Sequence, residues 1–258
     1  MLVVASLTRR AAPIGTSTSW RTSLWWRVAL GVVGVLIASV ALMPVENVIG
    51  HHVRQLDMRV AVEAHAFTAR ERVAHVAAQT VTFFGSTVWL TFMVAGLAIY
   101  WIRSGRRYAA GLLLAVSIGS AIVCRTIKLV VERERPDLAP ALADPHGSSF
   151  PSGHTMQSVA IYGVLLAIML PSITRRTRWM VVPLFASFIA SIAVSRVLLG
   201  VHYVSDITVG AALGTLWLML VALTEPAILD RALAHRVGVA RRRTRAEHPR
   251  RTSSSICR

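Results

Sequence analysis

The chain has 258 residues, of which 54% are hydrophobic, and its mean hydropathy is +0.57. Soluble domains are nearer to about 45–50% apolar, so an ordinary soluble protein is excluded. The formal net charge of +16 would suit a nucleic-acid-binding protein, but the basic residues gather in alternate connections and in the two tails, which argues against that class.

Six runs are apolar enough to form helices that cross a bilayer, which takes about 20 residues per helix. In chain order they cover 28–43, 81–102, 108–131, 152–173, 179–199 and 203–224. The sequence therefore predicts an all-α, polytopic membrane protein built as a six-transmembrane-helix bundle over 25–225. Residues 1–24 form a basic arm before it and residues 226–258 a basic tail after it.

The distribution of arginine predicts the orientation of the bundle. Arginines crowd the N-terminal arm, the connections near 103–107 and 175–178, and the C-terminal tail. Because cytoplasmic connections carry the excess of basic residues, we expect a multi-pass protein of the plasma membrane with both termini in the cytoplasm. The connections 44–80 and 132–151 and the turn at 200–203 then face outward.

The connection 44–80 carries apolar residues at helical spacing, which predicts an amphipathic helix on the outer surface that packs over the bundle. These residues are Val53, Leu56, Val60, Ala64 and Phe67.

The third run ends in "CRTIKLVVERERP", which holds Lys128, the only lysine of the chain, and Arg135. Seven residues make two helical turns, so both cations face one side if the helix persists. A lysine that reaches for the interface and an arginine paired with Glu132 or Glu134 are the plainer interpretations.

The fourth run begins with "FPSGH". Ser152 is a favourable N-cap, and Gly153 lets a ligand approach the backbone closely. The first turn of a helix has free N–H groups and the positive end of the helix dipole, which favours an anion. His154 stands beside this cradle, although simple capping with an interfacial histidine is the plainer interpretation.

A third stretch, "SRVLLGVHYVSD", covers 195–206. His202 and Asp206 are four residues apart, so they share one helix face and the carboxylate can fix the imidazole tautomer. A buried structural pair and a metal site are the alternatives. Lys128, Arg135 and Arg196 argue against a metal, because converging cations repel it and attract an anion.

All three stretches fall at the same predicted outer end of the bundle. Fixed cations, a helix N-terminus, two histidines and one carboxylate suit phosphoryl transfer, because the charge on the transferring oxygens needs donors placed in advance. One histidine can attack phosphorus and the other can protonate the leaving oxygen. Asp206 favours His202 as the nucleophile, but the residues alone leave that choice open.

These stretches resemble the motifs of the type-2 phosphatidic acid phosphatase and vanadium haloperoxidase superfamily. The pattern K-x6-R-P matches Lys128 to Pro136, P-S-G-H matches 151–154, and S-R-x5-H-x3-D matches 195–206, all within 128–206. The resemblance implies His202 as nucleophile, Asp206 as its orienting partner and His154 as general acid. It also implies that the phosphate oxygens are bound by Lys128, Arg135, Ser152, Gly153 and Arg196, with no metal and no other cofactor.

The sequence therefore predicts an integral membrane lipid phosphatase whose active site lies at the extracytoplasmic face. Its substrate would be a lipid phosphomonoester or pyrophosphate of the polyprenyl diphosphate, phosphatidic acid or phosphatidylglycerophosphate type, and its partners would be membrane lipids rather than nucleic acid. A lipid phosphotransferase with the same phosphohistidine intermediate and a non-enzymatic lipid-binding or translocating bundle are the alternatives. The sequence does not indicate an oligomeric state.

Overall fold

A computed structural model describes residues 53–138, 142 and 147–224, together with Gly34. The first predicted span, 28–43, lies outside the described residues except for Gly34, and both basic tails lie wholly outside them. Within the described part the chain is all helical and contains no strand. The all-α prediction is therefore confirmed for this part of the chain.

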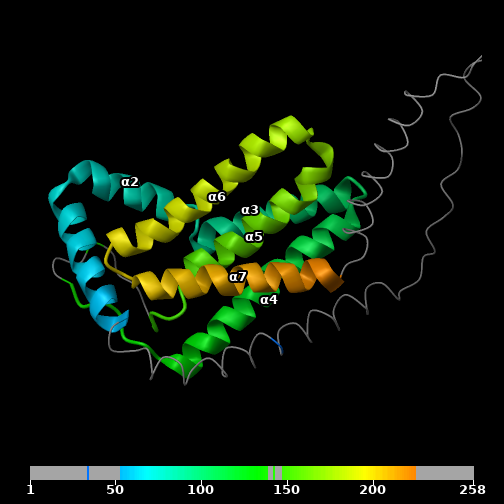
Figure 1. The fold of residues 1–258 in the computed structure, drawn as a ribbon. Coiled ribbons are helices and arrows are strands. Elements are labelled where there is room, and N and C mark those ends of the chain that lie inside the picture. The colour runs from blue at the N-terminus through cyan, green and yellow to red at the C-terminus, as the bar shows by residue number, and fades with distance from the viewer. Residues whose placement is uncertain (1–33, 35–52, 139–141, 143–146, 225–258) are drawn as a thin grey trace, which may run out of the picture.

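A helix over 53–70 comes first among the described ranges and is followed by the labelled elements (Figure 1). Five stretches of the described residues are long and apolar enough to cross a membrane. Their number agrees with the last five predicted spans. The elements in chain order are α2 (Arg72–Phe83), α3 (Thr87–Arg103), α4 (Arg107–Val131), α5 (Gly153–Met169), the 3₁₀ turn η1 (Leu170–Ser172), α6 (Arg175–Leu198) and α7 (Val204–Thr224).

The predicted span 81–102 is divided into two helices, which corrects its boundaries. The first of them, α2, begins at Arg72, and the chain turns at 84–86 before α3 starts. The turn forms because Ser86 has extended backbone angles and its Oγ accepts a hydrogen bond from the Trp89 N–H at 3.2 Å, which is an N-cap for α3. Gly85 is buried at this turn, where a Cβ would lie 2.4 Å from Ile192.

The centre of the bundle is α5, which packs against α4, α6 and α7. Its contact with α7 is backbone to backbone. A Cβ on Gly210 would lie 2.8 Å from the Ser152 carbonyl oxygen, and one on Gly214 would lie 2.7 Å from the Met156 carbonyl oxygen. The two glycines therefore set how closely α7 approaches α5.

Trp217 fills the space between α7 and α4. Its side chain is fully buried and its indole N–H donates to the Val116 carbonyl at 3.0 Å. A Cβ on Gly119 would lie 2.1 Å from the indole ring, so glycine is required there. A buried indole with a paired N–H contributes a large apolar area without leaving a polar group unsatisfied.

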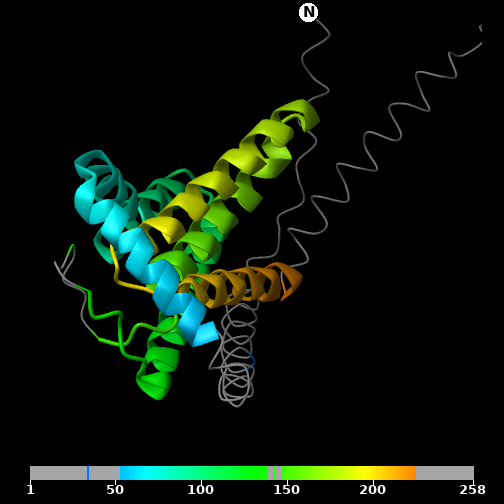
Figure 2. The ribbon, with the colours of Figure 1, turned by 60° about the vertical axis from the view of Figure 1, so that its left-hand side comes forward.

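The two ends of the bundle differ in character. At one end α4 and α6 finish and α5 and α7 begin (Figures 1 and 2). At the other end lie the α3–α4 turn and the start of α6, with the arginines of both connections. All three motif stretches identified in the sequence are at the first of these ends.

The helix over 53–70 lies beside this motif end of the bundle (Figure 2). The predicted helix is present, but the face expected to pack is wrong. Leu56 and Phe67 are 61% and 54% exposed. The buried side chains belong to another face of the helix and are Asp57, Ala61, His65 and Thr68. This face packs on the bundle because Asp57 pairs there with Arg133 and Ser205.

Candidate active site

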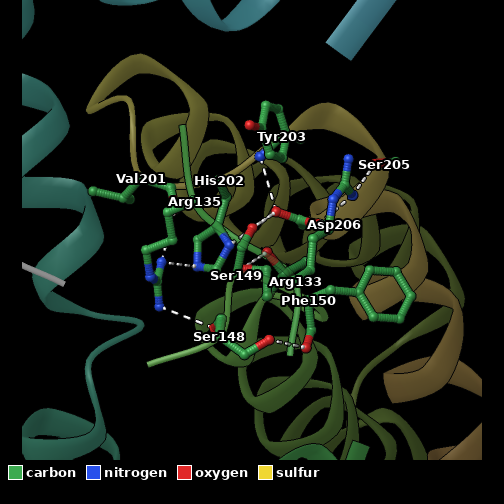
Figure 3. A network of polar contacts seen from close by, with 12 residues as sticks. Arg133, Arg135, Ser148, Ser149, Phe150, Val201, His202, Tyr203, Ser205 and Asp206 are labelled. Atoms are coloured by element: carbon green, nitrogen blue, oxygen red, sulfur yellow. Dashed lines mark hydrogen bonds and ion pairs between the residues drawn. The ribbon is translucent and has the colours of Figure 1, made fainter. Parts of the chain in front are cut away.

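His202 and Asp206 contact each other as the sequence predicts, but not on one helix. Because α7 begins at Val204, His202 lies in the turn that precedes the helix. The His202 Nδ1 is 3.3 Å from the Asp206 Oδ2, and both side chains are buried (Figure 3). Asp206 reaches back to accept the Tyr203 N–H at 2.9 Å, as the third residue of a helix does in a capping box.

Asp206 is the centre of a larger polar network. Its Oδ1 accepts a hydrogen bond from Arg133 Nη1 at 2.7 Å. Its Oδ2 accepts from the Ser149 hydroxyl as well as from Tyr203 and His202 (Figure 3). A fully buried carboxylate with several donors stays ionised, because its charge is compensated by hydrogen bonds and a paired cation.

Arg135 reaches the site from an extended segment rather than from α4. The predicted continuation of the helix is wrong, since α4 ends at Val131 and Glu132 adopts a left-handed conformation with φ 46°. Arg135 Nη1 donates to the Val201 carbonyl at 2.7 Å and lies 3.3 Å from His202 Nε2.

Lys128 remains on the last turn of α4 and also points toward the motif end. Its ammonium group donates to the Ser148 carbonyl oxygen, which Arg135 Nη2 also contacts at 3.2 Å. The two cations therefore converge on the segment that leads into α5, although they do not share a helix.

The stretch "PSGH" forms the start of α5, with Ser152 at the N-cap position. The Ser152 side chain does not cap the helix; its Oγ accepts a hydrogen bond from Thr155 Oγ1 at 3.1 Å. Its backbone N–H donates to the Asp206 carbonyl oxygen at 3.1 Å, which ties α5 to α7. A Cβ on Gly153 would lie 3.9 Å from the Lys128 Cε, so the glycine faces this cation.

His154 follows in the first turn of α5 and is half-buried. A Cβ on Gly85 would lie 3.3 Å from its Cδ2, so the α2–α3 turn packs against one edge of the ring. The cationic side chains of Arg196, Arg135 and Lys128 lie within electrostatic range of the ring, and so does the imidazole of His202.

Arg196 lies at the end of α6 and is 7% exposed. Its Nη1 donates to Thr82 Oγ1 at 2.8 Å, while its Nε finds no hydrogen-bond partner among the described residues. A buried guanidinium N–H without a partner is costly. An anion at this position would satisfy it.

The His202 ring is neutral at physiological pH. Burial lowers its pKa to about 4, against the opposing effect of Asp206, and the charges of Arg135 and Arg196 lower it further. With the proton of the neutral ring on Nδ1 and directed at Asp206, the Nε2 lone pair faces Arg135. Such an arrangement presents an oriented nucleophilic nitrogen beside a cation.

Together, the structure brings all eight predicted site residues to one end of the bundle. The described residues contain no group of three or more His, Cys, Asp or Glu side chains placed to hold a metal ion.

Four further residues of the network escaped the sequence reasoning: Asp57, Arg133, Ser149 and Ser205. Two sequence patterns could have indicated Arg133 and Asp57. In "ERER" the exposed glutamates alternate with half-buried arginines, as residues of an extended segment do, so Arg133 points the same way as Arg135. Asp57 shares a helix face with Ala61, which marks a carboxylate turned toward the bundle.

The geometry can be compared with known proteins. A family model described as the PAP2 superfamily matches residues 107–228. Phosphatidylglycerophosphatase B of Bacillus subtilis is 33% identical over 150 residues, which cover 55% of this chain and 70% of the relative. The decaprenylphosphoryl-5-phosphoribose phosphatase of Mycolicibacterium smegmatis is also 33% identical, over 58% of this chain and 78% of the relative.

A solved structure supports the same relationship. The crystal structure of a transmembrane PAP2-type phosphatidylglycerolphosphate phosphatase from Bacillus subtilis superposes with a TM-score of 0.61 and 25% identity. The match covers 76% of this chain and 94% of that one. The fold, the order of the motifs and the similarity over most of the relatives' length lead to one conclusion: the chain is a multi-pass membrane protein that belongs to the PAP2 superfamily.

Proposed function

We propose that this protein is a membrane lipid phosphatase that hydrolyses its substrate through a phosphohistidine on His202. The observation that carries the proposal is the orientation of the buried His202 ring, with Nδ1 3.3 Å from Asp206 Oδ2 and Nε2 3.3 Å from Arg135 Nη1. The neutral ring has its nucleophilic nitrogen beside a cation that would hold a phosphate oxygen.

In the first step His202 Nε2 attacks phosphorus as the bond from phosphorus to the lipid oxygen breaks. His154 gives its proton to that leaving oxygen, and Asp206 stabilises the positive charge that develops on the His202 ring. Donors fixed around the phosphate stabilise the charge on the three equatorial oxygens. They would come from Lys128, Arg135 and Arg196 and from the backbone at Ser152 and Gly153.

In the second step water attacks the phosphohistidine. His154, now deprotonated, accepts a proton from the water as the P–N bond breaks, which releases inorganic phosphate and restores the neutral His202. No metal takes part in either step. Arg196 Nε, which is buried without a described partner, supplies one of the donors that the transferring group would satisfy.

The substrate we propose is a phosphomonoester or pyrophosphate on a lipid. The named relatives act on phosphatidylglycerophosphate and on decaprenylphosphoryl-5-phosphoribose, by their descriptions, and both are lipid phosphates. Polyprenyl diphosphate and phosphatidic acid belong to the same chemical class. A site at the end of a bundle of membrane-crossing helices meets headgroups rather than lipid tails.

We also propose that the site faces away from the cytoplasm. The arginine-rich connections lie at the opposite end of the bundle, and such connections stay in the cytoplasm. In a Cys257→Ser background, an impermeant thiol reagent should label Asp137→Cys in intact cells and Arg106→Cys only after permeabilisation. Both positions are exposed. The reverse pattern would overturn the orientation.

The decisive experiment measures phosphate release by the purified protein in detergent from phosphatidylglycerophosphate, phosphatidic acid and a polyprenyl diphosphate, each with EDTA. Release by the wild type should resist EDTA and should disappear in His202→Ala. The matched control is His75→Ala, which removes a histidine of α2 that lies outside the motif stretches and should leave release unchanged. Loss of release on addition of EDTA would refute the metal-free mechanism.

A rapid-quench experiment tests the intermediate. With labelled p-nitrophenyl phosphate, whose leaving group needs no protonation, His154→Ala should accumulate a phosphoenzyme that is stable to alkali and labile to acid. Label transfer to an added lipid or sugar alcohol in place of water would indicate a phosphotransferase. Absence of any labelled enzyme and of phosphate release would favour a lipid-binding or translocating bundle.

A further inference from the structure

The helix over 53–70 precedes the part of the chain that matches the PAP2 family model, residues 107–228. It nevertheless sends one carboxylate into the active-site network. Asp57 is 3% exposed and lies on the buried face of this helix. A buried carboxylate persists only with compensating partners, so the groups that Asp57 meets indicate its role.

Asp57 binds two partners that come from separate parts of the site. Its Oδ1 accepts the backbone N–H of Ser205 at 3.0 Å, and its Oδ2 also accepts the Ser205 hydroxyl. The same Oδ2 accepts from Arg133 Nη2 at 3.0 Å. Asp57 therefore satisfies a free N–H in the first turn of α7, the helix that carries Asp206.

Arg133 connects this carboxylate to Asp206. While Nη2 binds Asp57, Nη1 donates to Asp206 Oδ1 and to the Ser205 hydroxyl, both at 2.7 Å. The guanidinium carbon lies 4.4 Å from the centre of the Tyr203 ring (Figure 3). The planar fork is thus held between two carboxylates and above an aromatic face, a geometry that lysine cannot reproduce.

The two oxygens of Asp206 have different tasks in this arrangement. Oδ1 is occupied by Arg133, and Oδ2 faces His202 Nδ1. A cation that is fixed on Oδ1 fixes the rotation of the carboxyl group, and with it the direction from which Oδ2 meets the imidazole. Without Asp57, Arg133 Nη2 would lose this ion pair.

We infer that Asp57 is a positioning residue for the reaction: through Arg133 it holds Asp206 in the rotation that orients His202. This inference rests on the proposed role of His202 as the nucleophile. It assigns a function to a segment outside the family match. It also explains why a carboxylate, rather than an apolar residue, lies on the buried face of the helix over 53–70.

The test compares kcat and KM for Asp57→Asn with those of the matched control Glu63→Gln. Glu63 is exposed on the same helix, so the control loses the same charge without touching the network. We expect Asp57→Asn to lower kcat by about 10- to 100-fold, since misplacement of a reacting group by about 1 Å costs up to about 10²-fold. KM should change little, because Asp57 contacts Arg133 and Ser205 rather than the groups proposed to bind phosphate. A kcat loss in Glu63→Gln equal to that in Asp57→Asn would overturn the inference.

A double-mutant cycle separates positioning from plain structural support. Arg133→Gln should lower kcat to a similar extent, and Asp57→Asn should cause no further loss in that background. Losses that multiply in the double variant would show that Asp57 acts independently of Arg133. If Asp57→Asn does not fold, the test uses Arg133→Lys instead. Lysine keeps the positive charge but cannot bridge two carboxylates. Full kcat in Arg133→Lys would refute the inference.

The variant His202→Ala shows whether a negative result refutes only the positioning role of Asp57 or the proposed function itself. If His202→Ala retains release, the phosphohistidine mechanism fails whatever Asp57 does. If His202→Ala is inactive while Asp57→Asn has the kcat of Glu63→Gln, only the positioning role fails.

Discussion

Replacement of Asp206 by asparagine exchanges one carboxylate oxygen for an NH₂ group at the centre of the network. The contacts of the two carboxylate oxygens determine the effect of the replacement. Oδ1 accepts from Arg133, whereas Oδ2 accepts from Ser149, Tyr203 and His202. A carboxylate offers acceptors on both sides. An amide offers one acceptor and one NH₂ donor, so one side of the introduced asparagine must turn a donor toward another donor.

The amide oxygen should take the Oδ2 position, because three donors meet there and only one meets Oδ1. The NH₂ group then faces the Arg133 guanidinium. Loss of that charged hydrogen bond should reduce the free energy of unfolding by about 1.5–3 kcal/mol. With no negative charge beside the His202 ring, kcat should fall by at least about 10²-fold, the scale of a lost electrostatic partner in a catalytic site.

The assay combines thermal unfolding in detergent with phosphate release. Asp206→Asn should lower both Tm and kcat. Adding Arg133→Gln should recover part of the Tm, because the glutamine carbonyl can accept from the introduced asparagine amide, but should not recover kcat. An Asp206→Asn protein that keeps the wild-type Tm and kcat would refute the assignment of Asp206 as the charged centre.

Two further predictions concern the core and the pH dependence. Gly119→Ala places a methyl group 2.1 Å from the Trp217 ring and should lower the free energy of unfolding by about 1–3 kcal/mol through overpacking. The control Gly96→Ala, whose methyl group meets no atom within 4 Å, should leave Tm unchanged or raise it. Equal Tm values for the two variants would contradict the packing. Because the pKa of His202 is lowered to about 4, its ring stays neutral above that pH. The acid limb of kcat/KM, corrected for ionisation of the substrate, should therefore lie near pH 4 rather than near the ordinary histidine value of about 6.5; a limb near 6.5 in the pH–rate profile would contradict a buried nucleophile.

The sequence was sufficient for the membrane-crossing helices in the described part of the chain. Length and hydropathy alone determine whether a segment fits the bilayer, so α4 to α7 appear close to their predicted bounds. The break between α2 and α3 was missed because Ser86 and Gly85 lie within a continuous apolar run. A hydropathy profile does not reveal a turn whose backbone polar groups are satisfied by capping.

The structure brings the predicted site residues together at one end of the bundle, but two of their local geometries differ from the prediction. The spacing of Lys128 and Arg135 suggested two helical turns, whereas α4 stops at Val131. The spacing of His202 and Asp206 suggested one helix face, whereas His202 precedes α7. Tertiary contacts still bring the side chains together: His202 contacts Asp206 directly, and Lys128 and Arg135 both donate to the Ser148 carbonyl oxygen. Periodicity describes neighbours within an element and cannot reveal such bonds.

Two residues of the Asp206 network that lie outside the motifs show a further limit of the sequence. Ser149 contacts Asp206 directly, whereas Asp57 is connected to it through Arg133. Ser149 lies 57 residues from Asp206 and Asp57 lies 148 residues from Ser205 along the chain, and neither has a sequence pattern that points to α7. Only the folded bundle reveals that they meet there.

The glycine seam between α5 and α7 has a consequence for how such a protein diversifies. Gly210 and Gly214 let the two main chains approach, and the Ser152 N–H binds the Asp206 carbonyl oxygen across the seam. The relative placement of the two histidine-bearing segments is thus set by main-chain atoms, which amino-acid replacement elsewhere does not alter. Side chains exposed on the outer helices, such as Phe92 and Trp179, take no part in this seam, so a lineage can change its outer surface while the placement of the two histidines is kept.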